Sequence, residues 1–244
     1  ILFSTEMVRA LIDGKKTQTR RVMKEPPAPY KGGVHPNLVA KHPAPYIDAY
    51  CSKRKTPTNP RGMSDEWYWW GEDDRLGPFV GKCPYMPGDL LWVRETWGIN
   101  HTDYCTGIIP KERLEDVHDD QMVYFSTEDD PEIQSEMPKR PSIHMPRWAS
   151  RLTLRVTNVR AERLQDISED DARAEGVRSE DLGRHLLWSG RANERPTLPS
   201  AKQGFLDHVW TDLYGEHEAK SVGANPWVWV YEFEVIQKNV DDVL

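Results

Sequence analysis

The first stretch of the chain with residue types suited to catalysis is cationic, rich in hydroxyl groups, and runs from Gly14 to Arg21. It reads Gly-Lys-Lys-Thr-Gln-Thr-Arg-Arg. A lysine whose pKa is lowered by burial or by neighbouring cations can accept a proton, and a threonine hydroxyl becomes a nucleophile when a base removes its proton. Lys16 and Thr19 are therefore catalytic candidates, and Arg21 is a candidate substrate contact. The alternative interpretation is an ordinary solvated strand after a helix end.

Charged residues at two later positions are further candidates. Glu175 stands at the end of an acidic segment, where it could donate a proton or could be a plain exposed helix residue. Arg94 and Glu95 interrupt an apolar stretch, and a charge in such surroundings is costly unless it is paired. We expect Arg94 and Glu95 to form either a structural ion pair or a substrate contact.

Aromatic and cationic side chains occur together in two places. The first place contains His144, Arg147 and Trp148. The guanidinium of an arginine can bind phosphate and the ring of a tryptophan can stack on a base, so these residues are suited to nucleic-acid binding. The alternative is that they pack where the chain enters the next strand. Residues 67–70 read Trp-Tyr-Trp-Trp. Such a cluster can stack unpaired bases, but it more often fastens an inserted segment to the body of a domain.

Metal and cofactor sites are not expected. His101 and Cys105 are four residues apart, as helical metal ligands are, but Cys83 and His118 would have to join them from other segments to complete a zinc site. The chain has no glycine-rich phosphate loop and no nucleophile elbow. We therefore predict no metal and no cofactor.

Composition limits the protein class. The chain has 244 residues and a net charge of −7, which argues against coating duplex DNA through bulk charge. Its three cysteines, Cys51, Cys83 and Cys105, are too few and too widely spaced for a disulfide framework, which favours the cytoplasm. No apolar run is long enough to span a bilayer. We expect a cytoplasmic protein without a membrane partner.

The elements that must position these residues follow from periodicity. Helices are predicted where apolar residues recur at helical spacing after capping residues, and strands where β-branched and aromatic residues alternate or cluster. The predicted helices cover residues 4–14, 168–176 and 201–215, and the predicted strands cover 90–97, 151–160 and 227–236. A further strand follows residue 16. Few helices and several widely separated strands predict an α+β fold, a small mixed β-barrel with short flanking helices.

Two long insertions separate the predicted core segments. The core covers about residues 1–24, 87–97, 148–180 and 201–237, and the insertions cover about 25–86 and 98–147. The first insertion is rich in proline and shows no periodicity of its own, and the second is acidic between Glu112 and Glu136. We expect a single domain over residues 1–244.

The motif Gly-x-Lys-x-x-Thr-x-Arg after a short helix resembles the signature of the ASCH domain, a relative of the PUA barrel. Residues 87–97 (Pro-Gly-Asp-Leu-Leu-Trp-Val-Arg-Glu-Thr-Trp) resemble the Gly-Asp strand of that family, residues 164–176 resemble its acidic helix, and residues 227–236 resemble its closing strand. With residues 141–150 included, the chain is similar to phage and prophage ASCH proteins. The resemblance implies a PUA-like barrel and nucleobase or nucleic-acid chemistry.

The site motif is similar to that of small bacterial ASCH enzymes that hydrolyse N4-acetylcytidine. The resemblance implies Lys16 as proton acceptor, Thr19 as nucleophile and Glu175 as proton donor. For this role the pKa of Lys16 must fall from about 10.4 toward 7, a shift worth about 4 kcal/mol. Because side chains three positions apart in a strand point to opposite faces, Lys16 and Thr19 converge only if the strand entry is kinked. We expect a hydrolase acting on modified cytidine, as a nucleoside or within nucleic acid.

Two other functions fit the same residues. A non-catalytic module could bind single-stranded RNA or DNA through Arg21, Arg147 and the tryptophans, and some ASCH relatives are ribonucleases. A protein-interaction role, for instance with a host factor, would show itself as one exposed apolar surface on the insertions. The expected partner is thus a nucleoside or a single-stranded nucleic acid, with a host protein as the remaining alternative.

Overall fold

The computed structural model describes residues 1–28, 30, 45–71, 76–99, 122–128, 133, 137–177, 200–215 and 217–243. The chain forms two compact units. The first unit comprises Ile1–Lys15, Leu90–Arg155 and Val235–Leu244, and the second comprises Lys16–Asp89 and Val156–Glu234. Lys16, Thr19 and Glu175 all belong to the second unit, whereas Arg94, Glu95, His144, Arg147 and Trp148 belong to the first.

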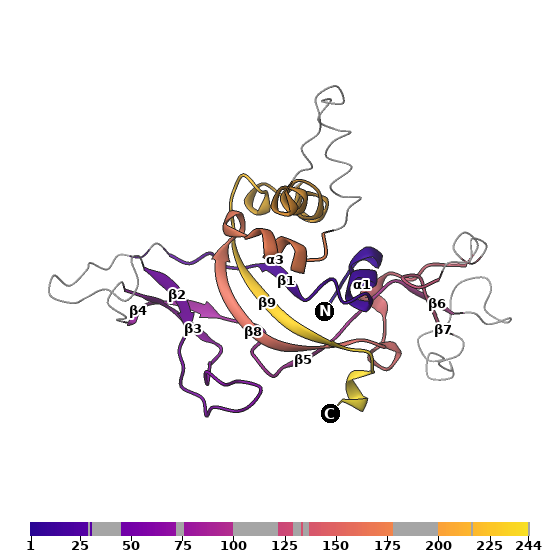
Figure 1. Cartoon of the computed structure of the whole chain (residues 1–244), viewed down its shortest axis with the longest axis horizontal. Coiled ribbons are helices and arrows are strands. Elements are labelled where there is room, and N and C mark those ends of the chain that lie inside the picture. The colour runs from indigo at the N-terminus through magenta and orange to yellow at the C-terminus, as the bar shows by residue number, and fades with distance from the viewer. Residues whose placement is uncertain are drawn as a thin grey trace, which may run out of the picture. The chain divides into compact units, whose positions relative to one another are not determined.

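The second unit is built on long antiparallel strands. Strand β1 (Gln18–Val22) pairs with β9 (Trp227–Ile236), from Gln18 opposite Glu232 to Val22 opposite Val228, and β8 (Thr153–Arg163) lies on the other side of β9. These strands are rich in β-branched and aromatic residues, which favour a pleated, half-buried surface. β8 and β9 are strongly curved (Figure 1). The predicted mixed α+β class is confirmed, with a curled half-barrel sheet and few helices.

In the first unit, the strand predicted over residues 90–97 is wrong in extent. Strand β5 (Leu90–Trp92) pairs with the first three residues of β8 and then stops. The Arg94 N–H donates to the Ile1 carbonyl at 2.8 Å, so the N-terminal segment pairs with the chain at that point. The chain resumes as β6 (Trp97–Ile99), which pairs with β7 (Met122–Tyr124).

The first insertion contains a sheet that the sequence did not predict. Strands β2 (Tyr46–Ala49), β3 (Glu66–Trp70) and β4 (Leu76–Lys82) form a three-stranded antiparallel sheet with β3 in the middle. The register between β3 and β4 shifts at Tyr68. The prolines of this region obscure its strands because they break up the alternation that identifies a strand in a sequence.

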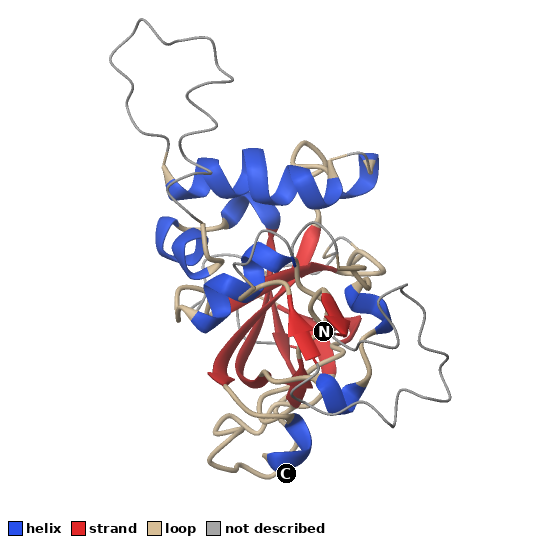
Figure 2. Cartoon of the chain, turned by 90° about the vertical axis from the view of Figure 1, so that its right-hand side faces the viewer, coloured by secondary structure: helices blue, strands red, loops and turns tan. Residues whose placement is uncertain are grey.

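The predicted helices are confirmed. Helix α1 (Thr5–Ile12) is capped by Ser4, whose hydroxyl accepts from the Met7 N–H, and Gly14 ends it with φ of +69°. Helix α3 (Glu169–Ala174) is capped in the same way by Ser168. The third segment is continuous (Figure 2) and consists of α5 (Ala201–Gly204), a π-helical stretch (Phe205–Trp210) and α6 (Thr211–Tyr214).

Short 3-10 helices complete the described elements, at Ser142–His144, Arg147–Ala149, Leu164–Asp166, Glu218–Lys220 and Val240–Asp242. No helix among the described residues combines the length and the apolar character that crossing a bilayer requires.

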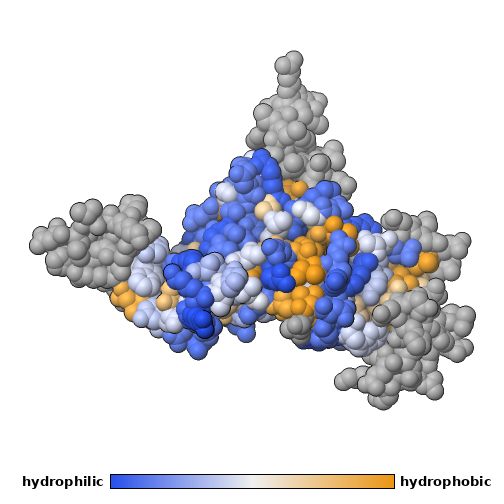
Figure 3. Space-filling model, turned by 60° about the horizontal axis from the view of Figure 1, so that its bottom comes forward, coloured by the Kyte–Doolittle hydropathy of each residue, from blue (hydrophilic) through white to orange (hydrophobic). Residues whose placement is uncertain are grey.

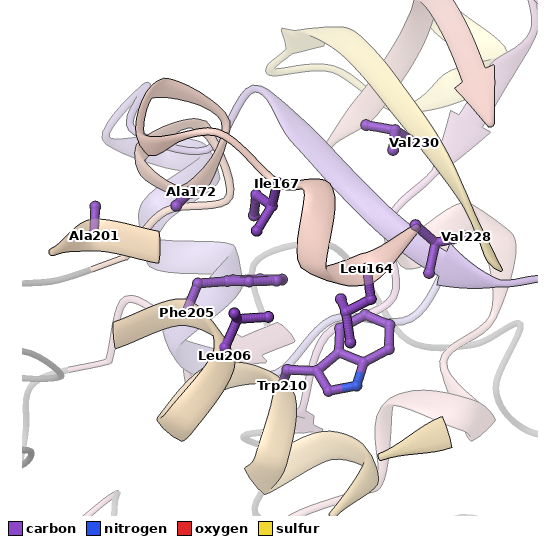
Figure 4. Packing of buried hydrophobic residues seen from close by; sticks show 9 residues of the cluster. All are labelled: Leu164, Ile167, Ala172, Ala201, Phe205, Leu206, Trp210, Val228 and Val230. Atoms are coloured by element: carbon purple, nitrogen blue, oxygen red, sulfur yellow. The ribbon is translucent and has the colours of Figure 1, made fainter. Parts of the chain in front are cut away.

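Two sets of buried side chains hold the second unit together. One joins α3 and the 201–214 helical segment to β9 (Figure 4), and it consists of Leu164, Ile167, Ala172, Ala201, Phe205, Leu206, Trp210, Val228 and Val230. The other fastens the three-stranded sheet to β9 through two edge-on tryptophan pairs, Trp67 with Trp229 at 4.9 Å and Trp69 with Trp227 at 5.7 Å. Trp67 and Trp69 therefore attach the inserted segment to the body of the domain, which was one of the two interpretations of residues 67–70.

Candidate functional site

The entry to β1 and the end of α3 meet through their backbones. Lys16 and Glu175 form an isolated antiparallel bridge. The Thr17 N–H donates to the Ala174 carbonyl at 2.9 Å, and the Thr17 carbonyl accepts from the Phe233 N–H of β9 at 2.9 Å. The cationic turn and the acidic helix, far apart in the chain, are therefore neighbours inside the second unit.

The Lys16 side chain points directly at Glu175. Its ammonium Nζ donates to Glu175 Oε2 at 2.8 Å and to the Glu175 backbone carbonyl at 2.8 Å. The Lys16 side chain is 0% exposed and the Glu175 side chain 3% exposed. A contact between two buried charged groups costs desolvation energy that a surface pair does not, so this pair is an unusual feature of the fold.

Arg20 is the second cation on Glu175. Its NH1 donates to Glu175 Oε1 at 3.0 Å, so the two carboxylate oxygens of Glu175 are shared between Arg20 and Lys16. Its Nε donates to Glu162 at 3.1 Å, and its guanidinium lies 5.9 Å from the Phe205 ring centre. The Arg20 side chain is completely buried. Arg20 therefore fixes the carboxylate plane of Glu175.

A wider ion-pair network surrounds this centre. Arg160 contacts Glu162 at 3.1 Å, Asp171 at 2.8 Å, and Glu232. Asp171 also lies 3.3 Å from Arg20. Three cations and four carboxylates thus stand on this face of β1, β8, β9 and α3. The cations are Lys16, Arg20 and Arg160, and the carboxylates are Glu162, Asp171, Glu175 and Glu232.

Burial and neighbouring charges set the protonation of these groups. Burial lowers the pKa of Lys16 below its ordinary value, and although Glu175 opposes this, the charges of Arg21 and Arg20 add to the lowering. Burial pushes the pKa of Asp171 upward, but the charge and hydrogen bond of Arg160 overcome this and hold it below its ordinary value. Lys16 therefore has the property that a proton-accepting lysine needs.

Thr19 lies on the opposite face of β1 from Lys16. The Gln18 amide donates to the Asp171 carbonyl at 2.7 Å, and Arg20 contacts Glu175, so Gln18 and Arg20 both point toward α3, as Lys16 does. Alternation along a strand then places Thr19 and Arg21 on the other face. There they lie in register with Tyr231 and Trp229 of β9. The junction is not kinked in the way that convergence of Lys16 and Thr19 would require.

The face of β1 and β9 that carries Thr19 is aromatic. The Tyr231 ring packs edge-on against Tyr85 at 5.4 Å, and its hydroxyl lies 3.5 Å from the Cys83 sulfur. Burial raises the pKa of the Cys83 thiol to about 11 and raises the pKa of Tyr231, and Cys83 adds to the rise at Tyr231. Thr19 itself is 4% exposed. Cys83 and Tyr231 are therefore both neutral at physiological pH.

In the first unit, Glu95 forms a structural ion pair with Arg151. The Arg151 Nε donates to Glu95 Oε1 at 2.9 Å, and the Ser126 hydroxyl donates to Oε2 of the same carboxylate. Arg94 instead donates to the Ile143 carbonyl at 3.2 Å and lies over the Trp92 ring at 4.3 Å. The Glu95 charge is thus compensated within the first unit, though by Arg151 and not by Arg94.

The remaining candidates in the first unit are His144, Arg147 and Trp148. Arg147 donates from Nε and NH2 to Asp241, at 3.1 and 2.7 Å. Trp148 is half-buried and packs against the buried cluster that contains Trp97. His144 is exposed. Trp148 thus follows the packing interpretation, whereas Arg147 is exposed and forms an exposed ion pair with Asp241.

Four members of the site were not predicted from the sequence, namely Arg20, Glu162, Asp171 and Arg160. The spacing between Lys16 and Arg20 could have indicated that Arg20 belongs to the site. It lies four residues after Lys16 along an extended segment, so the two side chains share a face. The three others could not be found in this way because β8 and α3 reach the site only through tertiary packing.

We next considered whether the described residues could bind a metal ion. Among the residues that the structure describes, no group of three or more His, Cys, Asp or Glu side chains is placed to hold a metal ion. The zinc candidates His101, Cys105 and His118 lie outside the described residues.

No protein-family model matches the chain, and neither the curated proteins nor the solved structures give a match.

Proposed function

We propose that the protein recognises a pyrimidine nucleobase and acts as an ASCH-type amidohydrolase on N4-acylated cytidine, with its active centre at Lys16 and Glu175 on a PUA-like barrel. The proposal is carried by one observation. The two segments that resemble the ASCH site motifs meet in a buried contact of 2.8 Å between these two side chains. The lowered pKa of Lys16 supports the same chemistry.

In the proposed reaction, water hydrolyses the amide to a carboxylic acid and cytidine. Lys16 in its neutral form accepts the proton of the attacking hydroxyl and passes it across the 2.8 Å contact to the Glu175 carboxylate, which delivers it to the departing amine. Arg20 keeps one Glu175 oxygen in place, at 3.0 Å. For the Thr19 hydroxyl to be the nucleophile, the entry to β1 must turn so that Thr19 comes to the face of Lys16.

A second candidate function is a non-catalytic base-binding module at the same strands. The observation that favours it is the position of Thr19, which stands opposite Tyr231 in the β1–β9 register and away from Lys16. In this case Arg21 contacts the nucleic acid, and no bond is broken. On the Thr19 face the Tyr231 ring is buried, and the half-buried Tyr85 ring that packs on it is the one that a base could reach.

An assay with N4-acylated cytidines, free and within oligonucleotides, separates the two functions. The amidohydrolase releases the acid and cytidine, and Thr19→Ala abolishes release if Thr19 is the nucleophile. A module that only binds shows no release, retains binding in Thr19→Ala and loses it in Arg21→Ala. Absence of both release and binding with every substrate would rule out the proposed function.

A further inference from the structure

The outer face of the three-stranded sheet in the second unit has no role in the proposed active centre. Trp67 and Trp69 face inward onto Trp229 and Trp227. Alternation along β3 therefore places Tyr68 on the opposite, outer face. In the registers of this sheet Tyr68 stands beside Phe79 of β4. We call the surface formed by Tyr50, Tyr68 and Phe79 the aromatic platform.

Three rings form the aromatic platform. Tyr68 lies between Tyr50, at 6.0 Å, and Phe79, at 5.3 Å, and both contacts are edge-on at 66°. Phe79 is 52% exposed and Tyr50 is 42% exposed. Figure 3 shows hydrophobic surface next to strongly hydrophilic surface at the end of the molecule where Figure 1 labels β2, β3 and β4. Exposed rings in contact with one another mark a surface available to a partner.

Cations border the aromatic platform. Lys53, Arg54 and Lys55 follow closely after Tyr50 and are all exposed. Their loop is ordered by its backbone, because the Lys53 N–H donates to the Gly62 carbonyl at 3.0 Å and the Thr56 N–H to the Asn59 carbonyl at 3.2 Å. Lys53 is only three residues after Tyr50, so the Cα atoms of these two residues are within about 11 Å of each other.

Two further cations belong to the same region. Arg61 is ion-paired with Asp48, which is in register with Tyr68, and Lys82 lies 3.6 Å from Asp65. Residues 45–82 carry six cations and six carboxylates, a net charge of zero, whereas the whole chain carries −7. The positive charge of this region is thus concentrated in the run Lys53, Arg54 and Lys55, which no carboxylate interrupts.

We infer that the aromatic platform binds single-stranded nucleic acid. Rings that stack on unpaired bases, beside cations that neutralise phosphates, are the two components from which such surfaces are built. A duplex hides its base faces and so offers the rings nothing to stack on. The inference extends the proposed nucleobase recognition to the polymer, but it does not depend on hydrolysis at Lys16.

Fluorescence anisotropy with labelled oligouridylate, oligothymidylate and a duplex of equal length tests the inference. We expect both single strands to bind at low salt and the duplex to bind more weakly. Phe79→Ala should weaken binding about tenfold, as expected when one base no longer stacks. Replacing Lys53, Arg54 and Lys55 by Gln should reduce the slope of log affinity against log salt by roughly 0.7 for each phosphate that these side chains neutralise in the wild type.

Matched controls are available in the described chain. Leu213→Ala removes an apolar side chain that is 44% exposed on α6, and Lys238→Gln removes an exposed cation. Both should bind as the wild type does. A protein that binds oligonucleotides but hydrolyses no N4-acylated cytidine would disprove the amidohydrolase alone.

Three results would overturn the inference. The first is that no single strand binds at low salt, and the second is that the platform variants bind as tightly as the controls. The third is that the wild type self-associates and Phe79→Ala makes it monomeric without any oligonucleotide binding. That result would assign the face to contacts between copies of the chain.

Discussion

The Lys16 ammonium lies 2.8 Å from Glu175 Oε2, and both side chains are sealed from solvent. Because Arg20 holds the other oxygen of the same carboxylate at 3.0 Å, Glu175 keeps a cationic partner whether Lys16 is charged or neutral. The site can therefore release the Lys16 proton without leaving an unpaired buried carboxylate. This property distinguishes it from an isolated buried ion pair.

The first prediction concerns stability in alkaline solution. The pKa of Lys16 in the folded protein is below the unfolded value of 10.5. Between these two pKa values the unfolded chain binds one more proton than the folded protein, so the Lys16 contribution to the free energy of unfolding rises with pH. The slope approaches about 1.4 kcal/mol per pH unit within that window. Above 10.5 the contribution is constant.

Urea unfolding of the wild type and of Lys16→Met over this alkaline range measures the effect. As the pH rises, the free energy of unfolding of the wild type should increase relative to that of Lys16→Met. Cys83 titrates in the same range, with its pKa raised to about 11, but it cancels in the difference. A difference that is independent of pH would show that the pKa of Lys16 is not lowered.

The second prediction concerns Arg20. Arg20→Met leaves Glu175 with Lys16 and Glu162 with Arg160 as their remaining cations, and breaking a buried pair by removing one partner costs about 3–5 kcal/mol. Urea unfolding near neutral pH gives the reduction in stability. Arg173→Met is the matched control because it removes an exposed arginine whose ion pair with Asp170 is also exposed, and it should cost less than about 1 kcal/mol. Equal effects of the two variants would contradict the buried network.

The third prediction concerns the attachment of the three-stranded sheet. Trp67 is fully buried against Trp229, so Trp67→Ala should lower the free energy of unfolding by about 3–5 kcal/mol. Phe79→Ala, on the exposed face of the same sheet, should change it by about 0.5 kcal/mol or less. If both variants were equally stable, the tryptophan pairs would not fasten this sheet.

The fourth prediction concerns the Glu95 and Arg151 pair in the first unit. Glu95→Ala leaves Arg151 without its partner, but the Arg151 side chain is 30% exposed and can be hydrated, so this variant should cost less than about 3 kcal/mol. Arg151→Ala leaves the Glu95 carboxylate, whose side chain is only 2% exposed, as a buried charge without its cation and should cost about 3–5 kcal/mol. A double-mutant cycle should show clear coupling, and strictly additive effects would mean that the two residues do not interact.

Local signals explain which elements the sequence predicted correctly. Ser4 and Ser168 are N-caps with a helical apolar pattern behind them, and both begin helices in the structure. The alternation of residues 151–160 and the β-branched and aromatic run of residues 227–236 predicted β8 and β9. The β2–β4 sheet was missed because its strands are short, shift register at Tyr68 and lie among prolines.

The site was only partly predictable for a physical reason. The proximity of Lys16 and Glu175 is a tertiary contact, and only the resemblance to a known motif indicated it. The opposite orientation of Thr19 follows from strand alternation, and the observed directions of Gln18 and Arg20 agree with it. The contributions of Glu162 and Asp171 depend on where β8 and α3 pack, which no local pattern encodes.

The most direct test of the central claim is the rate of cytidine release from N4-acetylcytidine, measured as a function of pH for the wild type and for Lys16→Met. The account predicts turnover that rises with pH through the pKa of Lys16, which lies below 10.5, and falls at least about a hundredfold in Lys16→Met. No release by the wild type, or equal release by both proteins, would contradict it.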